Sequence, residues 1–268
     1  MPTSEAGLAR ALRAARETAF EAGRLLVERQ GAAAVSRKGE INLVTEADME
    51  SEALCRGRLT AAVPGSVFLG EEEGGADPRG DLVWVVDPLD GTNNYAHGLP
   101  VFAVSIALCH RGEALVGVVH APCLDEMFSA AKGRGAQLNG RDIRVSSEDR
   151  LGRSMLATGF PYDIRTNKEA NNLGYFSVFS KEALGIRRFG SASIDLAWVA
   201  MGRFDGYWEL GLSIWDIAAG ALIVREAGGT VSDFHGGPVP NPPAEILATN
   251  ARIHEAMRCV LEGNTAGG

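Results

Sequence analysis

The sequence predicts a mixed α and β fold in two halves, an α+β first half followed by an α/β second half. Three patterns predict this class: a long amphipathic helix opens the chain, β-prone runs fill residues 101–147, and strands alternate with helices from residue 154 onward. The 268 residues suffice for a substantial hydrophobic core. Because residues 146–152 are polar, we expect residues 1–147 and 148–268 to form two halves of one compact unit.

The first half opens with two predicted helices. Apolar residues recur every three or four positions over residues 8–26, which predicts a helix with Thr3 or Ser4 as its N-cap and Gly31 at its end. A second helix is predicted over residues 47–62. The predicted strands of this half span residues 66–70, 82–86, 101–109, 114–120 and 127–131.

The second half alternates strands and helices. Its predicted strands span residues 154–158, 186–189, 204–209, 230–233 and 246–249. Its predicted helices span residues 168–180, 193–201, 215–227 and 251–261, with Asn167 as the N-cap of the first.

Composition excludes several classes of protein. The net charge of −8 argues against general nucleic-acid binding, because the surface as a whole repels phosphate backbones. The four cysteines lie far apart without CxxC spacing, which favours reduced thiols over a disulfide framework. The polar N-terminus lacks the apolar run of a signal peptide, and no stretch of about 18 apolar residues predicts a membrane span. We therefore expect a cytoplasmic protein with no membrane partner.

Carboxylates gather where the predicted elements begin or end. The acids in such places are Asp48, Glu71, Glu72, Asp87, Asp90 and Asp216. Grouped carboxylates repel one another unless cations neutralise them, and Mg²⁺ prefers oxygen ligands completed by water and substrate phosphate. The turn after residue 86 would present the Asp87 carboxylate, the Leu89 carbonyl and the Asp90 carboxylate to one small volume. A short helix that begins at Gly91-Thr92 would offer free N–H groups to an anion beside the metal, which indicates phosphate chemistry.

Each of these elements also has an ordinary explanation when taken alone. An Asp-Gly pair after a strand usually forms only a turn. Asp216 lies three residues after Ser213, the spacing of a capping box. Residues 71–73 would most often form a solvated loop, and Asp48 could help to cap the second helix.

Taken together, these motifs resemble the inositol monophosphatase family over nearly the whole chain. The residues that carry the resemblance are GEE at 70–72, WVVDPLDGTNN at 84–94, WDIAAG at 215–220 and EAGG at 226–229. Lys38 and the segment NLVTEAD at 42–48 also look like the family's stretch ahead of its metal site. The resemblance implies a layered αβαβα fold, a homodimer, and lithium-inhibited, Mg²⁺-dependent hydrolysis of phosphate monoesters.

The resemblance also implies roles for individual residues. With two to three Mg²⁺ per subunit, Glu71, Asp87 and the Leu89 carbonyl would hold the first ion. Asp87, Asp90 and Asp216 would hold the second, and Glu71 would reach a loosely bound third. Thr92, paired with Asp48, would orient and help to deprotonate the attacking water, and the Gly91 and Thr92 N–H groups would hold the phosphate.

The resemblance places substrate contacts at Gly190, Ser191, Ala192 and Glu209, with Asp90 and Asp216 contributing. A carboxylate such as Glu209 can accept hydrogen bonds from two neighbouring hydroxyls, which suits a polyol. Its ordinary alternative is an exposed Glu at the end of a strand. The pair Arg187-Arg188 could approach a second phosphate, form a dimer contact, or be plain polar surface.

The favoured function is hydrolysis of myo-inositol 1-phosphate to myo-inositol and phosphate by a metal-activated water. A relative tuned to fructose 1,6-bisphosphate or histidinol phosphate is the alternative within the same class, because the metal motif is common to all three. The short loop at residues 74–80 would leave the site open to such bulkier esters. The alternative from a different class is a protein-binding role in transcription or ribosome assembly, which the net charge does not oppose.

Overall fold

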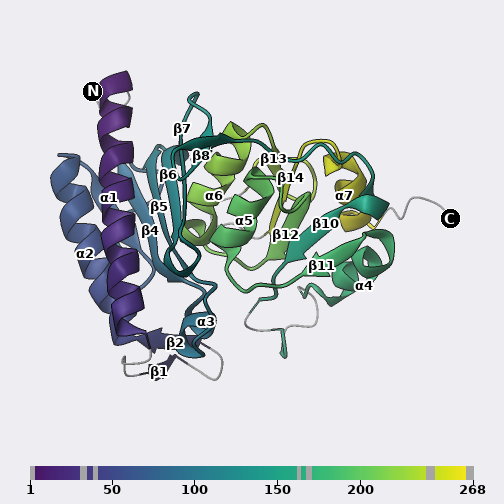
Figure 1. Ribbon diagram of the computed structural model, residues 1–268, viewed down its shortest axis with the longest axis horizontal. Coiled ribbons are helices and arrows are strands. Elements are labelled where there is room, and N and C mark those ends of the chain that lie inside the picture. Colours follow the sequence, from purple (N-terminus) through teal and green to yellow (C-terminus); the bar gives the residue numbers. More distant parts are fainter. Residues whose placement is uncertain are drawn as a thin grey trace.

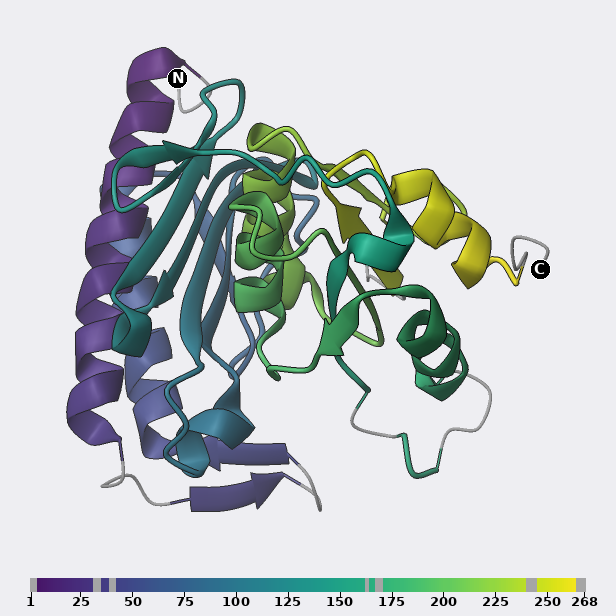
Figure 2. The same ribbon diagram turned by 45° about the vertical axis from the view of Figure 1, so that its right-hand side comes forward.

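In the computed structural model, five layers stack in the order helices, sheet, helices, sheet, helices (Figure 1). The structure describes residues 4–30, 35–38, 42–161, 164–166, 171–239 and 245–263. The purple N-terminal helix and the yellow C-terminal helix lie on opposite outer faces of the stack (Figure 2). The αβαβα layering expected from the sequence is therefore confirmed.

The first sheet has seven strands in the order β3-β4-β5-β6-β7-β8-β9. Their bounds are Val67–Gly70, Val83–Asp90, Ala103–His110, Glu113–Ala121, Glu126–Ala131, Ala136–Leu138 and Arg141–Ile143. Strand β3 pairs with β4 in parallel, and the strands from β4 onward form an antiparallel meander. A separate antiparallel pair is formed by β1 (Val35–Lys38) and β2 (Asn42–Thr45).

Helices cover both faces of this sheet. On one face lie α1 (Glu5–Arg29) and α2 (Glu46–Ala62), and on the other lie α5 (Ala192–Ala200) and α6 (Ile214–Glu226) (Figure 1). Helix α1 begins as predicted at Ser4, whose side chain accepts a hydrogen bond from the Gly7 N–H. The short helix α3 (Thr92–Ala96) follows β4 directly.

The second sheet has five strands in the order β11-β10-β12-β14-β13. Their bounds, in that order, are Gly185–Arg187, Met155–Thr158, Gly206–Leu210, Glu245–Thr249 and Thr230–Ser232. Its outer face is covered by α4 (Leu173–Glu182) and α7 (His254–Leu261). Two 3₁₀ turns, Pro122–Leu124 and Leu151–Arg153, complete the elements of the described chain.

Three apolar clusters fill the spaces between the five layers. Leu26 and Leu59, on α1 and α2, pack with Trp84 on one face of the first sheet. Between the sheets, all of α5 and residues 217–224 of α6 are buried, which explains why these stretches lack a polar face. Phe179 and Met257 close the outer face of the second sheet. The middle layer therefore joins the two sheets into one core.

Two predicted boundaries are wrong by four residues or more. The prediction ended the second strand of the first half at residue 86, but β4 continues to Asp90. Its pairing with β5 shifts between Asp87 and Asp90, a bulge that re-aims the side chains at this end of the strand. The helix predicted from residue 168 instead begins at Leu173, after Asn172. Thr3, Gly31 and Asn167, which were predicted to end or cap helices, lie outside the described residues.

All four cysteines are free, as expected from their spacing. No helix in the described part of the chain is both long and apolar enough to cross a membrane.

Candidate active site

Most of the predicted site residues line one cavity of about 350 Å³. It opens between the end of β4, the start of α3 and the start of α6. The predicted residues that line it are Glu71, Asp87, Leu89, Asp90, Gly91, Thr92, Gly190, Ala192, Glu209 and Asp216. Asp48 and Ser191 are not among its lining residues, although both are buried.

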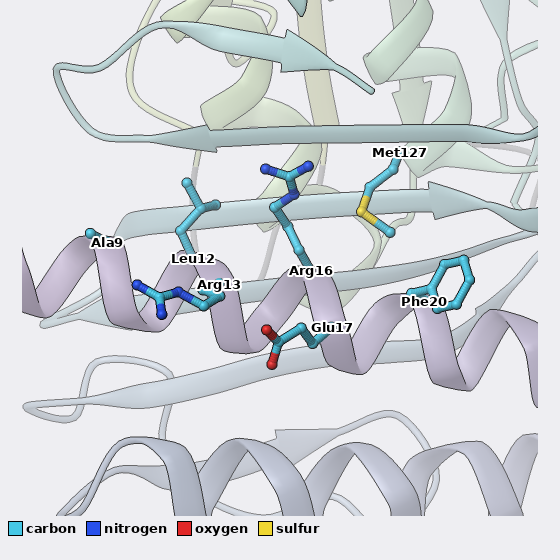
Figure 3. A pocket seen from close by; sticks show the side chains of 7 residues that line it. All are labelled: Ala9, Leu12, Arg13, Arg16, Glu17, Phe20 and Met127. Atoms are coloured by element: carbon cyan, nitrogen blue, oxygen red, sulfur yellow. The ribbon is translucent and has the colours of Figure 1, made fainter. Parts of the chain in front are cut away.

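A second cavity of about 540 Å³ lies along α1 and has a different character (Figure 3). Its walls are Ala9, Leu12, Arg13, Arg16, Glu17 and Phe20 of α1 and Met127 of β7. Glu17 is the one carboxylate in this lining. The smaller cavity, with five carboxylates in its lining, is therefore the candidate active site.

The end of β4 is held in a fixed conformation. Asp87 Oδ1 accepts a hydrogen bond from the Leu89 N–H at 2.9 Å, and Ser51 Oγ on α2 donates to the Pro88 carbonyl at 3.0 Å. Gly91 then takes φ +91°, and a Cβ there would lie 3.0 Å from the Val101 carbonyl. Glycine thus lets the chain turn from β4 into α3 within one residue.

Thr92 begins α3 and is buried beside this turn. Its hydroxyl donates to the Leu89 carbonyl at 3.0 Å, so Leu89 and Thr92 face the same point of the cavity. Asp48 lies in the first turn of α2, close enough for its charge to contribute to the raised pKa of Asp87. The pairing of Asp48 with Thr92 stays a prediction.

Asp90 connects the first half of the chain to the second. One of its oxygens, Oδ2, accepts hydrogen bonds from the Ser191 hydroxyl at 2.7 Å, the Ser193 N–H at 2.7 Å and the Ser193 hydroxyl at 2.5 Å. These donors stand at the N-terminus of α5. Ser191 therefore orients Asp90, and its predicted contact with substrate stays a prediction.

Asp216 serves local structure as well as lining the cavity. Its Oδ2 accepts the Ser213 N–H at 2.6 Å, and the two residues form the capping box that opens α6. The capping box predicted from the Ser213–Asp216 spacing is thus confirmed, and it leaves Asp216 in the lining of the cavity.

The carboxylates of the cavity destabilise one another when ionised. Burial raises the pKa of Asp87 well above its ordinary value, and the charges of Glu71, Asp90 and Asp216 raise it further. Burial also raises the pKa of Asp216, with Asp90 as the next contribution. Burial raises the pKa of Asp90, while its bonds to Ser193 and Ser191 act in the opposite direction. A cation placed among these groups would relieve both the burial and the repulsion.

The donor set fits hard divalent cations. It offers carboxylate and carbonyl oxygens without thiols or imidazoles, the chemistry that Mg²⁺ prefers. Among the described residues, no group of three or more His, Cys, Asp or Glu side chains lies in an arrangement that could hold a metal ion. The case for a cation here therefore rests on the chemistry of the lining oxygens.

Glu209, near the end of β12, also lines the cavity. Glu209 is buried, and burial raises its pKa to about 7, while the hydrogen bond from the Tyr207 hydroxyl opposes that change. Tyr207 Oη donates to Glu209 Oε2 at 2.5 Å. A Cβ at Gly159 would lie 2.0 Å from Glu209 Oε1, so only glycine leaves room for this carboxylate. Arg188, exposed at the rim, adds one positive charge to the lining.

Sequence reasoning missed the residues that hold the cavity's acids in place. Tyr207 stands two residues before Glu209, and the period of two along a strand was a signal that both point to one face. Ser193 had no such signal, because its link to Asp90 spans 103 residues. Asp195 was also missed: it is buried on α5, and burial, followed by the charge of Glu209, raises its pKa well above the ordinary value.

Comparison with known proteins identifies the family of the chain. A profile described as the inositol monophosphatase family matches residues 8–265. The chain belongs to the inositol monophosphatase family. Its fold likewise matches the solved inositol monophosphatase from Anabaena with a TM-score of 0.86 and 40% identity, over 94% of this chain and 95% of that one.

The relatives within the inositol monophosphatase family carry two kinds of name. An inositol-1-monophosphatase from Rhizobium meliloti is 43% identical, over 92% of this chain and 94% of the relative. A protein named Nus factor SuhB from Pseudomonas aeruginosa is 44% identical, over 94% of each chain. The extragenic suppressor protein suhB from Bartonella henselae has a TM-score of 0.87 and 40% identity, over 94% of this chain and 98% of that structure.

Proposed function

We propose that the protein hydrolyses myo-inositol 1-phosphate to myo-inositol and phosphate in a Mg²⁺-dependent reaction. The observation that carries this proposal is the cavity of about 350 Å³, whose lining brings together Glu209 and four other acids. The acids suit cations that bind phosphate, and Glu209 suits a polyol. Family membership supports a phosphatase.

The first group of residues would hold the metal. Glu71, Asp87 and the Leu89 carbonyl would form one site, and Asp87, Asp90 and Asp216 a second, with Glu71 reaching a third ion. When bound, Mg²⁺ supplies a water of lowered pKa and stabilises the leaving oxygen. The hydrogen bonds to Asp87, Asp90 and Asp216 restrict the rotation of these carboxylates before any ion arrives.

The second group would handle water and phosphate. Thr92, with Asp48, would orient the attacking water and accept its proton. The Gly91 and Thr92 N–H groups at the start of α3 would donate to the phosphate oxygens. The hydroxyl of Thr92 is already held against the Leu89 carbonyl, which supports its place next to the metal ligands.

The third group would recognise the alcohol. Glu209 would accept hydrogen bonds from two neighbouring hydroxyls of inositol, with Gly190, Ser191, Ala192, Asp90 and Asp216 as further contacts. The Tyr207 hydroxyl donates to one oxygen of Glu209, which restricts the rotation of this carboxylate. Burial would strengthen these hydrogen bonds, since the effective dielectric constant around a buried carboxylate is lower than in water.

Two other phosphate esters remain alternatives. Arg188 lines the cavity and is the feature that would favour fructose 1,6-bisphosphate, by contacting its second phosphate. Histidinol phosphate carries a cationic amine, which the acidic lining would accommodate. The homodimer implied by the family resemblance also stays a prediction.

A second candidate function is binding to a protein of the transcription machinery. The relatives named Nus factor SuhB favour it, one of them at 44% identity. Asp87→Asn separates the two candidates, since hydrolysis requires this carboxylate and a docking role does not.

The test is phosphate release by the purified protein from D-myo-inositol 1-phosphate, fructose 1,6-bisphosphate and histidinol phosphate. Each is assayed with Mg²⁺, with chelator, and with Mg²⁺ plus lithium. Chelator-sensitive, lithium-inhibited turnover that is fastest on the inositol ester supports the proposal. Faster turnover of another ester transfers the assignment to that substrate. Absence of turnover on these and on a wider panel of esters favours the protein-binding role.

A further inference from the structure

Two neighbouring residues of α2 contact both acid-bearing strand ends of the cavity. Ser51 donates to the Pro88 carbonyl, between Asp87 and Leu89. Glu52 reaches the other strand end and accepts the backbone N–H groups of Glu72 at 2.9 Å and Glu73 at 3.2 Å. These two N–H groups directly follow Glu71.

Glu52 is itself held in place from both sides. It is 2% exposed, and its Oε1 accepts a hydrogen bond from Arg56 Nη2 at 2.9 Å, one turn further along α2. The same Arg56 nitrogen lies 3.1 Å from the Glu73 carboxylate, and its guanidinium stacks over the Phe68 ring on β3 at 4.4 Å. Arg56 thus joins helix, strand and loop around Glu52.

The Glu52 carboxylate packs directly against Gly70, the last residue of β3 before Glu71. A Cβ at Gly70 would lie 2.3 Å from Glu52 Oε2, so the Glu52 carboxylate occupies the place of a side chain at position 70. Gly70 pairs in parallel with Val86, the residue before Asp87. The pairing of β3 with β4 thus sets Glu71 beside Asp87, and the carboxylate of Glu52 holds the backbone that directly follows Glu71.

We propose that Glu52, held by Arg56, is a positioning residue that sets the affinity of the cavity for divalent cations by fixing the loop that carries Glu71. This proposal rests on the proposed function, in which Glu71 is a metal ligand. Glu52 is not in the lining of the cavity, so it acts through the two backbone N–H groups. If buried Glu52 had only a structural role, its replacement would lower the stability of the fold and leave the affinity for divalent cations unchanged.

The test measures binding of Mg²⁺ alone, without substrate, by calorimetric titration. In Glu52→Gln, an amide NH₂ replaces one acceptor oxygen and faces an N–H group, so the loop is released. We expect the dissociation constant for Mg²⁺ to rise about 10- to 100-fold, as outer-shell substitutions do, with kcat at saturating Mg²⁺ largely retained. The control is Glu50→Gln on the same helix, whose exposed carboxylate pairs with Arg29.

A second variant guards against misfolding of the first. Gly70→Ala pushes the Glu52 carboxylate off the two N–H groups from the side of β3, and we expect the same weakening of Mg²⁺ binding. If both folded variants bind Mg²⁺ within about twofold of the wild type, the positioning role is wrong, whatever their thermal stability. If the wild type itself binds no Mg²⁺ and hydrolyses no ester, the proposed function fails, and the positioning role fails with it.

Discussion

Ser193 donates both its backbone N–H and its hydroxyl to the same oxygen of Asp90, a residue 103 positions earlier in the chain. The Ser191 hydroxyl binds this oxygen as well. Three donors from the start of α5 thus fix a carboxylate at the end of β4. The geometry of the cavity therefore depends on how the two sheets are joined, and not on the β4 loop alone.

Ser193→Ala should lower both stability and cation affinity. The variant keeps the N–H bond to Asp90 but loses the hydroxyl bond, and a hydrogen bond to a charged group contributes about 1.5–3 kcal/mol. Urea unfolding and Mg²⁺ titration measure the two effects. Ser180→Ala is the control, because Ser180 is exposed and bonds only within α4. Unchanged values for Ser193→Ala would contradict the role assigned to this link.

Asp87→Asn should abolish hydrolysis and stabilise the metal-free protein. The amide keeps an acceptor for the Leu89 N–H but removes one charge from the group of facing acids. We expect activity to fall by more than about 100-fold, and the free energy of unfolding in chelator to rise by about 0.5–2 kcal/mol.

The matched control for Asp87→Asn is Asp81→Asn, whose exposed carboxylate pairs with Arg111 outside the cavity. Phosphate release and urea unfolding in chelator check both parts. A variant that is less stable than the wild type in chelator would show that the acids do not strain the metal-free protein.

Glu209→Gln should weaken substrate binding while leaving cation binding intact. Its charge-assisted bonds to substrate hydroxyls are lost, so we expect KM for inositol 1-phosphate to rise about 10- to 100-fold. Tyr207→Phe removes the donor that orients Glu209 and should have a smaller effect in the same direction. Steady-state kinetics at saturating Mg²⁺ check this, with the exposed Glu182 changed to Gln as control. Equal KM values would place the hydroxyl contacts elsewhere.

His120 should make the protein less stable in weak acid. Its Nδ1 lies 2.9 Å from the Ala19 carbonyl of α1, so this nitrogen carries the proton of the neutral ring. Burial lowers the pKa of His120, against smaller opposing contributions from the Ala19 bond and Asp125. Below the ordinary pKa of 6.5, His120 is therefore protonated in the unfolded chain but still neutral in the folded protein. The free energy of unfolding then decreases as the pH is lowered.

His120→Asn tests this directly, since the Asn amide can donate to the same carbonyl without titrating. Between about pH 7.5 and about pH 5.5, we expect the wild type to lose more stability in urea than the variant. Parallel losses in both proteins would assign the acid sensitivity to other groups. The exposed His97 changed to Asn provides the control.

The fold and the acids of the cavity could be predicted because their signals are local. Strands that end in Asp87 and Asp90, a glycine before Thr92, and the Ser213–Asp216 spacing each lie within a few residues of sequence. The capping box is the clearest case, since four consecutive residues contain all of it. The layered architecture came from the family resemblance carried by these same motifs.

The parts that escaped prediction depend on contacts between distant segments. Helix α4 begins at Leu173 because the Asn172 amide binds the Thr158 hydroxyl and the Trp208 indole, which no local pattern contains. The bulge in β4 arises from its pairing with β5. The hydrogen bond from the Glu72 N–H to Glu52 joins the segment after β3 to α2, across 20 residues of sequence.

Asp216 both lines the cavity and closes the capping box of α6. Because of this, the acids of the cavity should not be lost with equal ease during evolution. Asn in place of Asp87 would keep the acceptor for the Leu89 N–H and remove one charge from the neighbouring acids, so a lineage that no longer needs hydrolysis could accept this change without harm to the fold. Loss of Asp216 would open the first turn of α6, in the layer that joins both sheets. Descendants that retain only a non-catalytic role should therefore vary at position 87 while keeping, at position 216, an acceptor for the Ser213 N–H.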